Sequence, residues 1–155
     1  MEYIPYTGKY EAKIDPKGRI VIPQSFRNML GEEFKICLSF DQRCLYVMDN
    51  LQYKKSSYKL TKFKLSTEAI IAKRFHAYSF DVKPDKQGRI VIPPQLRNKV
   101  HFDIATPVSI VGSGLYVEVW LTSALDDDFD SVSEADTKKM MDNFSFGDDD
   151  ESVEF

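Results

Sequence analysis

The chain has 155 residues, of which 43% are hydrophobic and 29% are charged, an ordinary composition for a globular protein. It has no apolar run near the roughly 18 residues of a membrane-spanning helix and no visible secretory signal, so we expect a cytoplasmic protein with no membrane partner. The net charge of −3 hides a segregation: residues 1–120 hold 19 Lys and Arg against 12 Asp and Glu, whereas residues 121–155 hold 2 against 12.

The first repeated unit begins with a predicted β-hairpin. Residues 10–15 alternate apolar with charged side chains, which is the period of a strand with one buried face. Asp15 to Gly18 supply the residue types of a type I turn, and the β-branched run at 19–22 predicts the returning strand. Pro23 ends that strand, and a short helix is expected over residues 24–30.

The rest of the chain repeats this plan around a different connector. A strand pair is predicted at 36–38 and 44–48, and the second unit is predicted to match with strands at 80–82, 89–92, 108–111 and 115–119 and a helix at 94–100. Helices are expected in the connector at 50–59 and 68–75, with Thr67 as the N-cap of the second. In the tail, a helix is expected from Ser133 to Phe144, followed by disorder.

The repeat itself is the strongest signal in the chain. Residues 15–30 read DPKGRIVIPQSFRNML and residues 85–100 read DKQGRIVIPPQLRNKV, with nine of sixteen positions identical at an offset of 70. A repeat of this length indicates that one small unit was duplicated.

Two such units are expected to fold together. A hairpin of about fifteen residues is too small to fold alone, so the apolar faces of the two hairpins have to cover each other. We therefore expect a mostly β fold with short helices (α+β), in which two swapped-hairpin units form an intertwined, double-lobed β-barrel with pseudo-two-fold symmetry. The predicted divisions are 8–50 for the first unit, 51–76 for a helical connector, 77–120 for the second unit and 121–155 for an acidic, partly disordered tail.

The turns carry the candidate site. Asp15 and Arg19 flank the first turn, and Asp85 and Arg89 flank the second, so each pair can face across its hairpin. A guanidinium held at a hairpin tip can bond guanine O6 and N7 in the major groove of DNA, which admits a two-stranded β-ribbon. Four lysines beside the turns could reach phosphates: Lys13, Lys17, Lys83 and Lys86. The alternative is that both pairs are ordinary cross-strand salt bridges.

These residues also carry a resemblance to a known family. Asp-x-x-Gly-Arg-Ile-Val-Ile-Pro followed by a short helix with Arg resembles the swapped-hairpin AbrB/SpoVT domain of bacterial transcription factors and antitoxins. Two copies in one short chain, with Gly8-Lys9-Tyr10 before the first and Glu118-Val119-Trp120 after the second, resemble the MraZ family over about residues 8–120.

The resemblance implies a function. It implies a nucleoid-associated transcriptional regulator, expected to be a repressor. Such a protein would bind short direct repeats of double-stranded DNA in the promoter of the division and cell-wall gene cluster that includes its own gene. It also implies a ring-shaped homo-oligomer, with the Asp-x-x-x-Arg turns in the DNA-binding surface.

Two other classes of protein were weighed. An antitoxin-like module would use the tail to bind a toxin, through Phe129, Phe144, Phe146 and Phe155 among acidic residues, although a merely solvating tail has the same composition. An enzyme is disfavoured, because His76 and His101 lie in no metal or triad spacing and no glycine-rich phosphate loop is present. Cys37 and Cys44 are expected to be free thiols. We therefore expect no cofactor, no metal and no small-molecule substrate.

Overall fold

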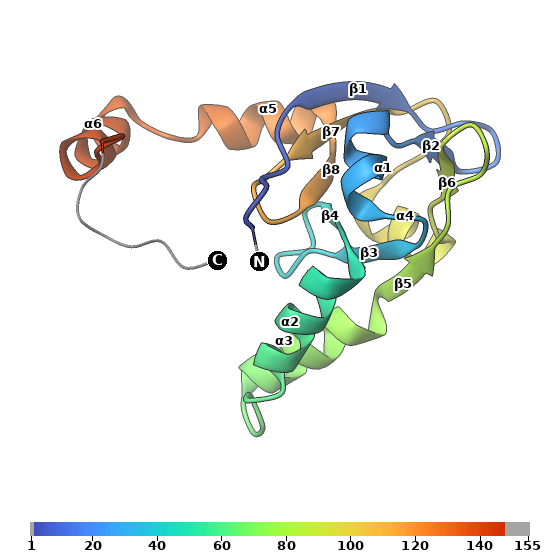
Figure 1. Ribbon diagram of the computed structural model, residues 1–155, viewed down its shortest axis with the longest axis horizontal. Helices are drawn as coiled ribbons and strands as arrows, with labels where there is room; N and C mark the ends of the chain where they lie inside the picture. Colours follow the sequence, from blue (N-terminus) through green and yellow to red (C-terminus); the bar gives the residue numbers. More distant parts are fainter. Residues whose placement is uncertain (1, 148–155) are drawn as a thin grey trace.

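Both copies of the repeat fold into the same series of elements. The computed structural model describes residues 2–147. The first copy forms β1 (Lys9–Lys13), β2 (Arg19–Val21), α1 (Gln24–Leu30), β3 (Phe34–Leu38) and β4 (Leu45–Met48). The second copy forms β5 (Ser79–Val82), β6 (Arg89–Val91), α4 (Pro94–Val100), β7 (Pro107–Gly112) and β8 (Val117–Leu121). The predicted α+β class is confirmed (Figure 1).

Strand pairing crosses between the two copies. A six-stranded antiparallel sheet has the order β1-β7-β8-β4-β3-β5, and a second sheet consists of β2 and β6. The first strand of each copy therefore pairs with the third strand of the other copy. The strand order is also symmetric: if the strands of the two copies are interchanged, the same six-stranded order results. Neither copy completes a sheet alone, which is why the repeat has to fold as a unit. Closure of these strands into a barrel stays a prediction.

The core forms where the two copies meet. Ile20, Ile22, Ile90 and Ile92 are at most 2% exposed and belong to one apolar cluster that spans both copies. Each such side chain contributes roughly 1.5–3 kcal/mol by leaving water. Pro23 and its repeat counterpart end β2 and β6, because proline has no amide to donate to a neighbouring strand. The short helices begin at the next residue and turn one apolar face onto this cluster.

A helical arm, residues 50–77, connects the copies. It consists of α2 (Asn50–Leu60) and α3 (Thr67–Ala77), and Asp49 caps α2 by accepting a hydrogen bond from the Gln52 amide at 2.8 Å. The predicted cap of α3 was wrong by one residue. Thr67 is already helical, and Ser66 is the N-cap, because its carbonyl accepts from the amides of Ala69 and Ile70.

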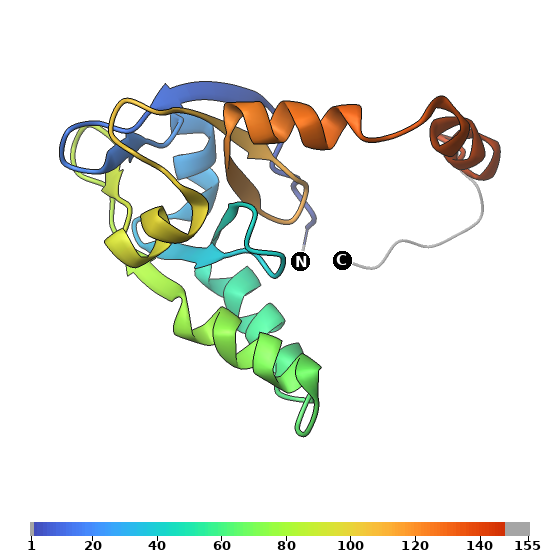
Figure 2. The same cartoon turned by 180° about the vertical axis from the view of Figure 1, so that it is seen from behind.

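The tail begins with a helix that the sequence did not predict. α5 (Thr122–Asp130) lies against β7 and β8, where Leu125 is buried with Trp120 and Cys44. The one helix predicted in the tail, from Ser133 to Phe144, is confirmed as α6 (Glu134–Asn143), and the Ser133 hydroxyl caps it by accepting from the Asp136 amide at 3.1 Å. Both views place α6 apart from the body of the protein (Figures 1 and 2). Most of the predicted disordered stretch, residues 148–155, lies outside the described residues.

Candidate nucleic-acid interface

The first turn is organised around the carboxylate of Asp15. Its Oδ1 accepts hydrogen bonds from the amides of Lys17 (2.9 Å) and Arg19 (2.8 Å), and its Oδ2 accepts from the Nε of Arg19 at 2.7 Å. The backbone closes the turn, since the Gly18 amide donates to the Asp15 carbonyl at 2.9 Å. One carboxylate thus fixes both the loop and the guanidinium, and only the second of these roles is predicted from the sequence.

The second turn repeats this geometry. Asp85 accepts from the amides of Gln87 (2.9 Å) and Arg89 (3.0 Å) through Oδ1, and from the Nε of Arg89 (2.7 Å) through Oδ2. Lys17 in the first turn is replaced by Gln87 in the second, but only the backbone amide is used at that position, so the fold of the turn is unaffected.

The same hydrogen bonds set the charge of the two carboxyl groups. Partial desolvation on its own would raise the pKa of Asp15, but the bonds from Arg19 and Lys17 outweigh it and hold this pKa below its ordinary value. For Asp85, the bond from the Arg89 amide is the largest cause of a pKa that is also lowered. Both carboxylates are therefore ionised at neutral pH and keep the arginine side chains oriented.

The two arginines lie on one face of the β2–β6 ribbon. Arg19 is opposite Val91 and Val21 is opposite Arg89, and directly opposed residues of an antiparallel pair share a face. Val21 and Val91 are 49% and 55% exposed, whereas the alternate residues of the ribbon face the core. The outer face of the ribbon thus displays two valines flanked by two arginines, with roughly 8 Å between the arginine Cα atoms from strand spacing.

Each turn is held by the other copy of the repeat. The Gly18 carbonyl accepts from the Ile92 amide at 3.0 Å, and the Ile92 carbonyl accepts from Nε of Arg97 at 3.1 Å. The guanidinium of Arg97 lies over Gly18, where an added Cβ would be 2.7 Å from its Cζ. A second arginine therefore stands beside the first turn, contributed by α4 of the other copy.

The symmetric contact involves Arg27 on α1. Its Nε donates to the Ile22 carbonyl at 2.8 Å, and its guanidinium lies over Gly88 of the second turn. Sequence reasoning did not include Arg27 and Arg97 among the site residues. The signal that could have identified them is that arginine recurs at both positions, 70 residues apart. Packing alone does not require arginine at a half-exposed position of a helix, so its recurrence points to another role.

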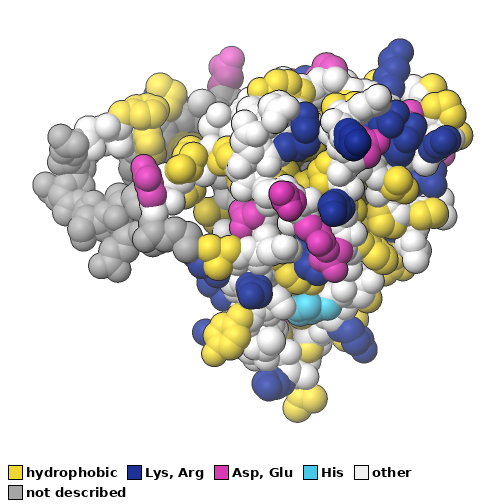
Figure 3. Space-filling view, turned by 45° about the vertical axis from the view of Figure 1, so that its right-hand side comes forward, with side chains coloured by type: hydrophobic (Ala, Val, Ile, Leu, Met, Phe, Trp, Pro, Cys, Tyr) yellow, Lys and Arg dark blue, Asp and Glu magenta, His cyan; other side chains and the backbone are white. Residues whose placement is uncertain are grey.

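The predicted lysines surround this face. Lys13, Lys17, Lys83 and Lys86 are all exposed, and the two turns that carry or adjoin them project at the same edge of the molecule in both ribbon views. With that edge turned forward, Lys and Arg side chains gather around it, with acidic side chains among them (Figure 3). The arrangement is a two-fold ribbon surrounded by cationic side chains.

Other chemistry has weaker candidates. Among residues 2–147 no group of three or more His, Cys, Asp or Glu side chains is placed to hold a metal ion, and no helix is long and apolar enough to cross a membrane. His76 is engaged with the Ala72 carbonyl and the Ser57 hydroxyl. Cys37 and Cys44 are free and buried, and burial raises the pKa of Cys37 to about 12.

The fold and the turns define the class of this protein: it consists of two interlocked hairpin units in tandem, each with an Asp–Arg pair at its turn. Comparison with known proteins gives the family. The family described as "MraZ protein, putative antitoxin-like" matches residues 6–76. The chain is 35% identical to the transcriptional regulator MraZ of Caldanaerobacter subterraneus subsp. tengcongensis, over 89% of this chain and 97% of that protein. It is 38% identical to the transcriptional regulator MraZ of Thermoanaerobacter sp. strain X514, over 73% of this chain and 78% of that protein. The chain belongs to the MraZ family.

One solved structure is also similar. The solution structure of PHS018 from Pyrococcus horikoshii aligns with 75% of this chain and 96% of that chain at 16% identity, with a TM-score of 0.34. A likeness at this level carries no argument about function.

Proposed function

We propose that this protein is a sequence-specific DNA-binding transcriptional regulator whose β2–β6 ribbon enters the major groove. The observation that carries the proposal is the outer face of the ribbon, where Arg19 and Arg89 flank two exposed valines in a two-fold arrangement. The names of its relatives support the class of function, since they are transcriptional regulators rather than enzymes.

The arginines are prepared for a bidentate contact. The carboxylates of Asp15 and Asp85 bond the Nε atoms of Arg19 and Arg89, and among the described residues the Nη atoms of both arginines donate no hydrogen bond. A guanidinium fixed at Nε presents its outer edge as a fork, which matches guanine O6 and N7. Because the carboxylate has already restricted the side chain, less conformational entropy is lost when DNA binds.

The valines suit the apolar feature of the same groove. The only apolar group on the major-groove edge of a base pair is the thymine methyl group. Val21 and Val91 each lie opposite one arginine and two residues along the strand from the other, so they are placed to contact methyl groups next to the guanines that the arginines would read. The ribbon would therefore prefer sites in which G and T are neighbours.

The remaining cations suit the DNA backbone. Arg27 and Arg97 lie beside the turns, and lysines 13, 17, 83 and 86 surround them with exposed ammonium groups. Contacts of this kind orient a protein on the duplex and carry no sequence information of their own.

The biological setting follows from the family resemblance. We propose that the protein associates with the nucleoid and binds short direct repeats in the promoter of the division and cell-wall gene cluster that contains its own gene. We also propose that several copies assemble, in a ring, so that weak contacts to successive repeats add through effective concentration.

Binding to the DNA just upstream of the protein's own start codon tests the proposal. Arg19→Ala and Arg89→Ala should each cost about 1–3 kcal/mol of affinity per engaged site, and the double variant should lose sequence preference. Lys62→Ala is the control, because it removes one charge from the arm, away from the ribbon. Fluorescence anisotropy at fixed salt gives the affinities. Unchanged affinity and preference in the double variant would reject the proposal.

A further inference from the structure

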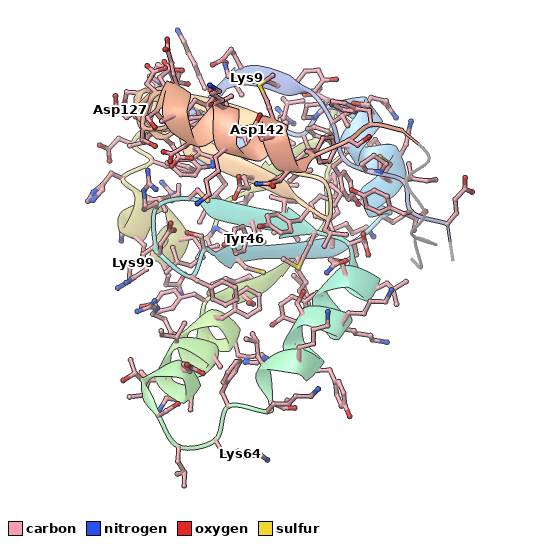
Figure 4. The ribbon with its side chains drawn as sticks, turned by 90° about the vertical axis from the view of Figure 1, so that its left-hand side faces the viewer. Lys9, Tyr46, Lys64, Lys99, Asp127 and Asp142 are labelled. Carbon is pink, nitrogen blue, oxygen red and sulfur yellow. The ribbon has the colours of Figure 1, made fainter. Side chains whose placement is uncertain are left out.

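The helical arm forms a second basic region, separate from the ribbon. Residues 50–77 hold seven Lys and Arg against one Glu, a net of +6, whereas residues 1–120 as a whole carry +7. Lys64 lies in the loop at the far end of the arm, away from the sheet (Figure 4). The arm lies apart from the ribbon and its turns, so its charge needs an explanation of its own.

The end of the arm also exposes apolar side chains. A hollow of about 630 Å³ is lined by Phe63, Leu65 and Ile70, together with Lys64 and Lys73. Leu65 is 96% exposed and Ile70 is 61% exposed. Neighbouring apolar side chains that stay in water, rimmed by charge of one sign, are typical of an interaction surface.

The C-terminal helix has the complementary character. All residues of α6 are exposed, and its large apolar side chains are the adjacent Met140 and Met141. Phe144, the C-cap residue, follows them with an extended backbone and is exposed as well. The segment that contains it, residues 121–155, carries −10. On α6 itself, three acidic residues outnumber two lysines, and the rest of the segment is acidic. Exposed apolar side chains in a segment of net negative charge therefore match an apolar hollow in a basic arm.

The tail is directed away from the arm of its own chain. α5 is anchored by Leu125, which is 1% exposed, and by an ion pair at 3.0 Å between Arg43 Nη1 and Asp128 Oδ1. From this anchor, the two opposite views show α6 on a different side of the body from the arm (Figures 1 and 2). The hollow of one copy is therefore suited to the helix of another copy.

We propose that α6 of one copy docks into the hollow at the end of the arm of a second copy. Met140 and Met141 would enter the hollow, and the acidic side chains of α6, Glu134, Asp136 and Asp142, would face Lys64 and Lys73. Such a contact joins two different surfaces, so it repeats from copy to copy and closes into a ring when the rotation allows. This inference supplies the interface for the self-association proposed above, and it does not depend on the DNA-binding ribbon.

Charge and apolar variants on both surfaces test the contact. The arm variant is Lys64→Glu with Lys73→Glu, and the tail variant is Met140→Ser with Met141→Ser. All four side chains are exposed, so folding should be unaffected, which circular dichroism checks. Light scattering coupled to size exclusion should show an assembly for the unaltered chain that weakens with salt, and single chains for either variant. Lys86→Glu with Lys99→Glu is the matched control and should assemble normally.

A mixture of the two variants gives the sharpest result. The arm variant keeps a working tail and the tail variant keeps a working arm, so an equal mixture should form dimers and nothing larger. A single-chain mass for the unaltered protein at every concentration, or unchanged assembly of the arm variant, would overturn the proposal. A third result would also overturn it: the arm variant assembles normally but no longer binds anionic lipid vesicles that the unaltered protein binds. That result would show that the hollow contacts a membrane surface. Arg19→Ala should assemble fully, so failure of the DNA-binding proposal is separable from failure of this one.

Discussion

Arg97 covers Gly18 across the boundary between the two copies of the repeat. A methyl group at Gly18 would lie 2.7 Å from Cζ of Arg97, and Gly18 has a φ of +75°, a conformation that favours glycine. Two independent constraints therefore meet at one residue, one from the backbone of the turn and one from the opposite copy.

Gly18→Ala should lower the free energy of unfolding by about 1–3 kcal/mol from the backbone strain, and more if Arg97 has to move. A double-mutant cycle separates the two causes. In an Arg97→Ala background the steric part disappears, so the same substitution should cost measurably less in urea unfolding. Equal costs in both backgrounds would show that Arg97 does not restrict the turn.

Arg97→Gln and Arg27→Gln should weaken DNA binding by a similar factor for every sequence tested. We expect this because these side chains lie beside the turns, where phosphates rather than base edges are within reach. Each substitution should also reduce the slope of log affinity against log salt by about 1. Arg19→Ala is the comparison, since it should change the ranking of sequences; a changed ranking for Arg97→Gln would contradict its assignment to the backbone.

The turns illustrate what a sequence can predict. Asp15, Gly18 and Arg19 lie within five residues of one another, and their contacts are local, so residue types and the repeat were enough to identify the pair. The arginine over each turn was not predictable in this way. Arg97 is 79 residues from Gly18 in the sequence, and only the crossing of strands between the copies brings the two together.

The missed helix has a different cause. α5 has no side-chain hydrogen bond at its N-cap residue Leu121, no acidic residue in its first turn, and aspartates near its C-terminus, where they oppose the helix dipole. Local signals therefore argue against it. It forms because Leu125 is buried beside Trp120, and because Arg43 pairs with Asp128 and lies over the Trp120 ring at 5.0 Å. Those are tertiary contacts that no local window contains.

Acid should loosen the turns. The pKa values of Asp15 and Asp85 are lowered from 3.8 in the folded chain, so each carboxylate stabilises the fold fully at pH values above 3.8. That contribution is lost as the pH falls through the lowered folded pKa values. Carboxyl carbon NMR shifts should titrate below pH 3.8, and the protection of the Arg19 amide against hydrogen exchange, relative to its intrinsic rate at each pH, should fall over the same range.

Asp15→Asn provides the control for this titration. An asparagine oxygen can still accept from the amides of Lys17 and Arg19, but it gives Arg19 Nε no charged partner. Its turn should remain folded and lose the pH dependence, while the Asp85 turn keeps it. A pH profile that is unchanged at the Arg19 amide in this variant would assign the effect to other carboxylates.

Replacing thymine by deoxyuridine in a bound DNA site removes only a methyl group, and this should weaken binding if Val21 and Val91 contact it. The expected loss is about 0.8 kcal/mol for each contacted methyl, roughly fourfold in affinity, because a buried apolar carbon is returned to water. The double variant Val21→Ala with Val91→Ala should bind more weakly and discriminate less between the two DNAs. Arg19→Ala should retain the discrimination at lower overall affinity, since the role proposed for Arg19 is to contact guanine. If the unaltered protein binds both DNAs equally, the valines do not contact the thymine methyl groups, and sequence recognition would rest on the arginines alone.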